Sequence, residues 1–260
     1  VHLGDKEEDA NGITTHVPDV SGYELNNVTF YYENLYLKPV LENISLDIPK
    51  NKITAILGPS GAGKTTLLKV LLKFYQPSKG LVRYGGINVA EFSHKEFRSK
   101  CGVVLQNGYI FSDSIEGNIC LKKEKINQKK FMEVVKVAGV SDFIFDFDQG
   151  YSTKIGANGI AVSKGQAQRI CLARALYKSP DILILDEATS ALDLQVEEKI
   201  INNIKAYCKE MTIIIVAHRI NMIRAADHIA VLSNGKIIET GSQKDLLARK
   251  GQFYHFMKEY

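Results

Sequence analysis

One eight-residue segment constrains the fold of this 260-residue chain more than any other part of it. The segment reads Gly58-Pro59-Ser60-Gly61-Ala62-Gly63-Lys64-Thr65. It fits the pattern G-x-x-x-x-G-K-[ST] and stands between an apolar run, Ile53–Leu57, and a helix-like run that begins near Thr65. A strand, turn and helix of this kind cradle phosphate, because glycines admit backbone N–H groups and the helix N-terminus adds partial positive charge. The alternative is a glycine-rich turn with a surface lysine, which the flanking strand and helix disfavour.

This phosphate loop predicts roles for its last residues. Lys64 can reach the β- and γ-phosphates of a nucleotide, which makes it a candidate catalytic residue, and the Thr65 hydroxyl can bind Mg²⁺. The residues that we expect to bind the nucleotide here are Gly58, Pro59, Ser60, Gly61, Ala62, Gly63, Lys64, Thr65 and Thr66.

A second site feature is an apolar run, residues 182–185, that leads into Asp186 and Glu187. A buried parallel strand that ends in carboxylates places them at the carboxyl edge of its sheet, where α/β proteins bind ligands. We expect Asp186 to hold Mg²⁺ and Glu187 to polarise the attacking water. The alternative is an acidic pair that favours the dipole of a following helix.

The remaining pattern predicts an α/β fold: a P-loop NTPase core with an antiparallel β subdomain and an inserted α-helical subdomain. Residues 25–30 and Leu41–Ile48 resemble strands, and the second alternates apolar and polar side chains. Helical periodicity dominates the middle of the chain, after which apolar strands alternate with helices again. We expect a lead-in at residues 1–20 and one domain at residues 21–260, with the helical subdomain at about residues 107–180 and one or two amphipathic helices at the C-terminus.

Composition excludes several classes of protein. A net charge of +4 is too small and too evenly spread to indicate nucleic acid, and 45% hydrophobic residues exclude whole-chain disorder. No window of roughly 18 uncharged apolar residues predicts a membrane span, and no secretory signal is visible. The missing initiator Met suggests a piece of a longer chain. Four cysteines without a C-x-x-C pair predict reduced, buried thiols rather than a zinc or redox motif.

Several short segments at characteristic places complete the pattern: Gln106 after the run Gly102-Val103-Val104-Leu105; Val162-Ser163-Lys164-Gly165-Gln166; Ser190-Ala191-Leu192-Asp193; and His218 after residues 213–217. With the phosphate loop and the acidic strand end, they make residues 23–260 resemble the nucleotide-binding domain of an ATP-binding cassette (ABC) transporter. The resemblance implies the ABC ATPase fold and hydrolysis of ATP with Mg²⁺.

The resemblance also implies a role for each segment. Tyr32 would stack on adenine; Tyr31 is its rival, and a cross-strand aromatic is the alternative for either. Gln106 would contact Mg²⁺ or the water, and His218 would contact the γ-phosphate as a catalytic residue. Residues 190–193 would pass between two subunits. Ser163, Gly165 and Gln166 would face the γ-phosphate held by the opposite subunit.

Residues 162–166 lie at the position of the family's signature motif, whose pattern is L-S-G-G-Q. This signature segment departs from the pattern at Val162 and Lys164. Ser163 and Gln166 also have capping-box spacing, so a plain helix start is the structural alternative, and a capped helix N-terminus is itself an anion site. Lys164 could strengthen ATP capture, or it could obstruct the approach of the two subunits.

Two more segments resemble those of exporters. Residues 111–119 resemble the segment that docks transmembrane coupling helices, and residues 153–159 resemble the exporter X-loop, with different charged positions. The V-S-K-G-Q form is similar to that of bacterial peptide or bacteriocin exporters.

The resemblance implies partners and a location. We expect a second copy of the domain, as a homodimer or half of a heterodimer, and the transmembrane domain of the same transporter, at the cytoplasmic face of the inner membrane. We expect no nucleic acid. The alternatives are a soluble ABC ATPase acting on ribosomes or DNA, a regulatory nucleotide binder without activity, and a small-molecule kinase.

Overall fold

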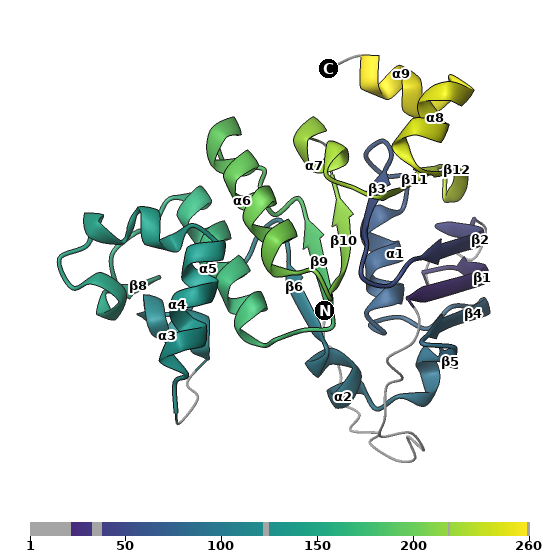
Figure 1. Ribbon diagram of the computed structural model, residues 1–260. Helices are drawn as coiled ribbons and strands as arrows, with labels where there is room; N and C mark the ends of the chain where they lie inside the picture. The colour runs from purple at the N-terminus through teal and green to yellow at the C-terminus, as the bar shows by residue number, and fades with distance from the viewer. Residues whose placement is uncertain (1–21, 33–37, 122–124, 218, 259–260) are drawn as a thin grey trace.

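The central sheet of the protein contains six strands. Their bounds are β3 (Ile53–Leu57), β6 (Cys101–Val104), β9 (Ile182–Asp186), β10 (Thr212–Val216), β11 (His228–Ser233) and β12 (Lys236–Gly241). The computed structural model describes residues 22–32, 38–121, 125–217 and 219–258. The strand order is β12-β11-β3-β10-β9-β6, with β12 antiparallel to β11 and the other pairs parallel (Figure 1).

The inner strands of this sheet are apolar because both faces are covered. Every residue of β3, β9 and β10 is buried. Successive side chains point to opposite faces, so Ala55 and Leu57 join one apolar core while Ile56 joins the other. The predicted strands at Ile53–Leu57 and at residues 182–185 are confirmed.

A second, antiparallel sheet covers one face of the central sheet together with α1. Its strands are β1 (Tyr23–Phe30), β2 (Leu41–Ile48), β4 (Lys79–Tyr84) and β5 (Ile87–Asn88), in the order β2-β1-β4-β5. Helix α1 (Lys64–Leu71) packs in the same core as β1 and β2. Alternating burial along β2 matches its predicted alternation of apolar and polar residues. Both the antiparallel sheet and the parallel core agree with the predicted fold class.

Helices gather on the other side of β6 and β9, at the left of Figure 1. They are α3 (Ile115–Cys120), α4 (Gln128–Val137) and α5 (Lys164–Tyr177), and short 3₁₀ turns follow α4: η2 (Val140–Asp142), η3 (Ile144–Asp146) and η4 (Gly150–Ser152). Their apolar side chains share one core with Ala55, Leu183 and Ile213 of the central sheet. Gly139 follows the C-cap of α4 and is the N-cap of η2. Its φ of 69° is in the left-handed region, which a glycine adopts readily where a helix ends. The predicted limits of this subdomain and of the whole domain stay predictions, and the predicted lead-in at residues 1–20 lies outside the described residues.

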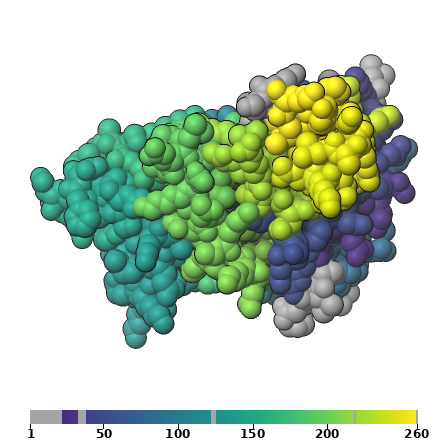
Figure 2. All heavy atoms as spheres, turned by 45° about the horizontal axis from the view of Figure 1, so that its top comes forward, coloured from purple at the N-terminus to yellow at the C-terminus, as the bar shows by residue number. Residues whose placement is uncertain are grey.

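The remaining elements connect and cap the sheets. They are η1 (Val89–Glu91), α2 (His94–Ser99), β7 (Asp113–Ser114), β8 (Lys154–Ile155), α6 (Leu194–Tyr207), α7 (Ile220–Arg224), α8 (Gln243–Arg249) and α9 (Gln252–Lys258). The C-terminal segment forms two helices, as predicted. In Figure 2 the two C-terminal helices, in yellow, lie at the upper right of the visible face, and the helical part, in teal, lies at its left. All four cysteines are buried free thiols, as predicted.

Candidate functional site

The phosphate loop lies between β3 and α1, in the predicted order of strand, loop and helix. Two of its glycines are required by the backbone. A Cβ at Gly58 would lie 2.0 Å from the carbonyl oxygen of Leu232 in β11, and Gly63 has φ +106°, a conformation that L side chains rarely adopt. Pro59, Ser60 and Gly61 are exposed at the tip of the loop.

Lys64 is buried and folds back onto its own loop. Its Nζ donates hydrogen bonds to the carbonyl oxygens of Gly58, at 2.8 Å, and Pro59, at 2.9 Å. Burial lowers the pKa of Lys64, and the nearby carboxylates of Glu187 and Asp186 act in the opposite direction. β3 and β9 both pair in parallel with β10, so Lys64, just after β3, and the acidic pair at the end of β9 lie at the same edge of the sheet.

Tyr32 is joined to the first turn of α1. Its hydroxyl lies 3.0 Å from Oγ1 of Thr66, and its ring packs edge-on against Phe30 and Tyr75. Tyr31 instead binds Ser78 through its backbone N–H. Tyr32, and not Tyr31, therefore contacts the phosphate loop through its side chain. This contact favours Tyr32 as the residue that would stack on adenine, and that role stays a prediction.

The acidic strand end lies at the carboxyl edge of the central sheet. Asp186 is the last residue of β9 and is buried, and it stands opposite Val216 of β10. Glu187 follows with φ 51°, in the left-handed region that is rare for residues other than glycine. Such a conformation persists only where the surroundings enforce it, and it concentrates at functional sites.

Gln106 reaches this acidic pair from a neighbouring strand. It follows β6 after one intervening residue, and its Nε2 donates a hydrogen bond of 2.6 Å to Oε2 of Glu187. The structure therefore brings Lys64, Asp186, Glu187 and Gln106, all predicted site residues, to one edge of the sheet.

The predicted Mg²⁺ ligands carry suitable donor atoms. Thr65 is exposed on the first turn of α1 and offers a hydroxyl oxygen, Asp186 a carboxylate and Gln106 an amide oxygen. Mg²⁺ prefers oxygen ligands and is usually held by one or two carboxylates together with substrate phosphates. This donor set fits that chemistry.

The signature residues lie on a different face of the sheet. Ser163 is the N-cap of α5: its Oγ accepts from the Gln166 N–H at 3.1 Å, and the Gln166 side chain accepts from the Ser163 N–H at 2.9 Å. The predicted capping box is confirmed. A Cβ on Gly165 would lie 3.0 Å from the Ala191 carbonyl oxygen. Helix α5 packs in one apolar core and α1 in the other, so this chain does not bring Ser163 onto the face that carries α1.

The two exporter-like segments meet in space. β7, from residues 111–119, pairs with β8, from residues 153–159. Arg174 of α5 holds the first segment by donating to the carbonyl oxygen of Asn118 at 2.7 Å. Large apolar side chains are exposed beside it, Tyr109 at 69% and Phe111 at 44%.

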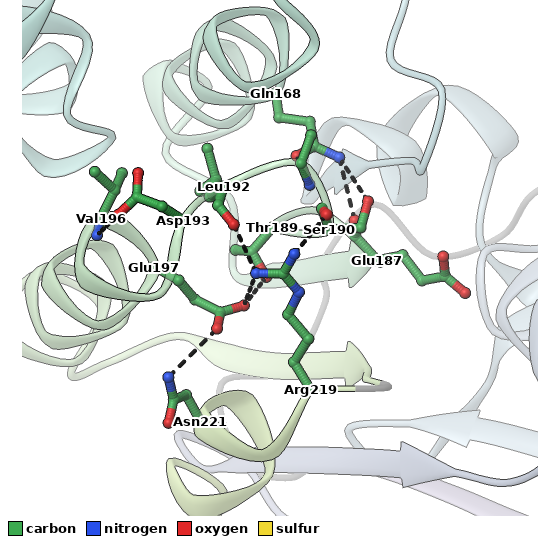
Figure 3. Close-up of polar contacts among 11 residues, drawn as sticks. Gln168, Glu187, Thr189, Ser190, Leu192, Asp193, Val196, Glu197, Arg219 and Asn221 are labelled. Atoms are coloured by element: carbon green, nitrogen blue, oxygen red, sulfur yellow. Dashed lines mark hydrogen bonds and ion pairs between the residues drawn. The ribbon is translucent and has the colours of Figure 1, made fainter.

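Sequence reasoning missed three residues near the acidic pair. Gln168, Arg219 and Glu197 form a network around the turn that follows Glu187 (Figure 3). The sequence could have indicated that Glu197 is buried, because it lies on the apolar face of α6 with Ile200 and Ile204. The contacts of Gln168 and Arg219 could not be predicted from the sequence pattern, because their partners are distant in sequence. His218, predicted as catalytic, lies outside the described residues.

Comparison with known proteins gives consistent matches. Residues 41–190 match the sequence profile of the family described as "ABC transporter". In Staphylococcus aureus, a protein named "Putative multidrug export ATP-binding/permease protein" is 40% identical over 232 residues in the bovine RF122 / ET3-1 strain. The corresponding protein of strain NCTC 8325 / PS 47 is 39% identical over 232 residues. Each alignment covers 89% of this chain and 40% of the relative, so the chain spans less than half the length of these relatives.

A solved structure extends the match to the fold. The structure described as "a bacterial Atm1-family ABC exporter with ATP bound" superimposes with a TM-score of 0.88 and 33% sequence identity. The match covers 96% of this chain and 43% of that one. Among the residues described for the present chain, no helix combines the length and apolar character needed to cross a bilayer.

Proposed function

The chain belongs to the ABC transporter family, and from that premise we propose that it is the ATP-binding and ATP-hydrolysing domain of an exporter. One observation carries this proposal: β3 and β9 both pair in parallel with β10, so the phosphate loop after β3 and the acidic pair at the end of β9 lie at the same edge of the sheet. A cation for phosphates beside carboxylates for metal and water is the arrangement that phosphoryl transfer needs.

In this proposal, residues 58–66 bind the phosphates through backbone N–H groups and Lys64, and Tyr32 stacks on adenine. The hydrogen bond between Tyr32 and Thr66 supports the last assignment, because it fixes the ring beside the loop. Lys64 exchanges its carbonyl partners, Gly58 and Pro59, for phosphate oxygens.

Thr65, Gln106 and Asp186 would hold Mg²⁺, which neutralises charge on the phosphates during transfer. Glu187 orients the attacking water and accepts its proton. Gln106 donates to the Glu187 carboxylate and so restricts its orientation. His218 is proposed to contact the γ-phosphate.

A second copy completes the site in this proposal. Ser163, Gly165 and Gln166 stand at the exposed start of a helix whose N–H groups and dipole favour anions. Because α5 and α1 pack on opposite faces of the sheet, the ATP of a partner chain is the anion that these residues would meet. Two such domains would close head to tail around two ATP molecules, either as a homodimer of this chain or with this chain as half of a heterodimer.

The exporter assignment adds a membrane partner. The paired segments β7 and β8, with exposed Tyr109 and Phe111 beside them, would contact the transmembrane domain of the same transporter. In this proposal the chain would lie at the cytoplasmic face of the inner membrane. The V-S-K-G-Q form of residues 162–166 supports a peptide as cargo.

The test is ATP hydrolysis by the complete protein that carries this chain. Glu187→Gln should lower kcat by about a hundredfold or more while ATP still binds, because the water loses its base. Glu198→Gln, an exposed carboxylate of α6, is the control and should leave kcat unchanged. Absence of hydrolysis in the unaltered protein, or near-normal kcat in Glu187→Gln, would contradict the proposal.

A further inference from the structure

The 187–193 turn runs from Glu187 to the N-cap of α6, and side chains hold it from two sides. Figure 3 shows Gln168 on one side and Arg219 on the other. The Glu187 carboxylate points away from both of them. Gln168 belongs to α5, the helix that begins at Ser163.

Gln168 binds the turn through both ends of its amide. Its Oε1 accepts from the Ala191 N–H at 3.1 Å, and its Nε2 donates to the Glu187 carbonyl oxygen at 3.3 Å and to Ser190 Oγ at 3.1 Å. The residue is only 3% exposed, so these bonds do not compete with bulk water.

The Glu187 backbone is the part of the turn that needs support. Its φ of 51° is unfavourable for a residue with a side chain. Its N–H donates to the Val216 carbonyl oxygen at 3.2 Å, and its own carbonyl oxygen accepts from the Ser190 N–H at 3.1 Å as well as from Gln168. Gln168 is therefore the side chain that binds the peptide group directly following the Glu187 Cα.

Packing and hydrogen bonds share the work of fixing this turn. Ala188 and Leu192 are buried in the apolar core, whereas a small open pocket of about 90 Å³ lies beside Glu187, Ser190 and Arg219. On the side of the pocket the turn has fewer van der Waals partners, so directional hydrogen bonds contribute to its position there.

Arg219 supplies the hydrogen bonds on the opposite side. Its guanidinium donates to the carbonyl oxygens of Leu192, at 2.7 Å, and Ser190, at 2.6 Å. The fully buried Glu197 lies 3.7 Å from it and accepts from Thr189 Oγ1 at 2.6 Å. Both ends of the turn are thus anchored, and Gln168 is the anchor nearest Glu187.

We propose that Gln168 is a positioning residue for Glu187, holding the strained backbone that aims the carboxylate at the attacking water. This inference rests on the proposed function. Because Gln168 belongs to the helix that starts at Ser163, movement of that helix on closure of a dimer would shift the Glu187 peptide through one side chain.

The experiment is steady-state ATP hydrolysis by the complete protein with Gln168→Met, which keeps the length of the side chain and removes its hydrogen bonds. We expect kcat to fall about tenfold while the KM for ATP and equilibrium ATP binding change less than about twofold, because the loss affects only the water-activating group. The matched control is Asn203→Leu, which removes amide bonds to the carbonyl oxygens of Lys136 and Val137 in the helical part. It should leave kcat unchanged.

A second readout separates positioning from general structural support. If Gln168 acts through Glu187, Gln168→Met should cause no further loss of the residual hydrolysis in a Glu187→Gln background. Should Gln168→Met not fold, Gln168→Asn, whose amide is too short to reach the turn, takes its place. An unchanged kcat in the folded variant, an equal loss in Asn203→Leu, or a full multiplicative loss in the Glu187→Gln background would overturn the inference. Absence of hydrolysis in the unaltered protein would instead reject the proposed function.

Discussion

Among single residues, Lys64 is the one that the phosphate loop holds most closely. Its Nζ binds the Gly58 and Pro59 carbonyl oxygens, so a buried ammonium group is hydrogen-bonded within the loop. The sequence pattern predicted this lysine because the motif is local, with fixed spacing from the glycines. The left-handed backbone of Glu187 could not be predicted, since nothing in the residues around it demands φ 51°.

Removing the Lys64 ammonium should therefore weaken nucleotide binding directly. In Lys64→Ala we expect the affinity for ATP to fall by about tenfold or more, because a charge-assisted contact to phosphate is lost. Equilibrium binding of a fluorescent ATP analogue measures this effect. Lys52→Ala, an exposed lysine before β3, is the control. Equal affinities in the two variants would show that Lys64 does not bind phosphate.

Whole elements were predictable where their signal is local. The uniform burial of β3 and β9 follows from their unbroken apolar runs, and Ser163 begins α5 because its side chain caps the helix. The pairing of β7 with β8 was not predicted, because two-residue strands far apart in sequence leave no periodic pattern. The 3₁₀ turns that follow α4 were also not predicted, because they lie within a segment whose periodicity is helical.

The start of α5 offers a test that separates capping from ligand binding. Ser163 and Ser242 are both N-caps, with Oγ accepting from the Gln166 N–H at 3.1 Å and from the Asp245 N–H at 3.2 Å. Either serine replaced by alanine should lower the free energy of unfolding by about 1 kcal/mol. Only Ser163→Ala should also lower ATP hydrolysis, by about tenfold, because only Ser163 is proposed to meet a partner's γ-phosphate. Thermal unfolding and ATPase assays on both variants measure these effects. If Ser163→Ala and Ser242→Ala hydrolyse ATP at the same rate, Ser163 acts only as a helix cap.

On the scale of the whole molecule, the sheet separates the two halves of the proposed site. Helix α1 and the phosphate loop belong to one apolar core, whereas α5 belongs to the other. The predicted fold class is confirmed by both sheets and by the match to a solved exporter structure. Assembly could not be derived from residue pattern alone, because nothing in the residues around Ser163 and Gly58 indicates whether the two serve a site within one copy or between copies.

Cross-linking between copies tests that central claim most directly. Two tagged copies of the complete protein, both with Glu187→Gln, are coexpressed, one with Ser60→Cys and the other with Ser163→Cys; both serines are exposed. The four cysteines of this chain are buried, and burial raises the pKa of the Cys101 and Cys208 thiols to about 12, so they stay protonated at neutral pH. Exposed cysteines elsewhere in the protein are replaced.

The readout is a disulfide-linked dimer that carries both tags, and the control pairs Ser60→Cys with Ser179→Cys, an exposed position just beyond the other end of α5. With ATP and Mg²⁺, the Ser163→Cys pair should cross-link far more than with ADP and far more than the control. Cross-linking that is equal for the two pairs, or independent of ATP, would contradict a site built from the phosphate loop of one copy and the α5 N-terminus of another.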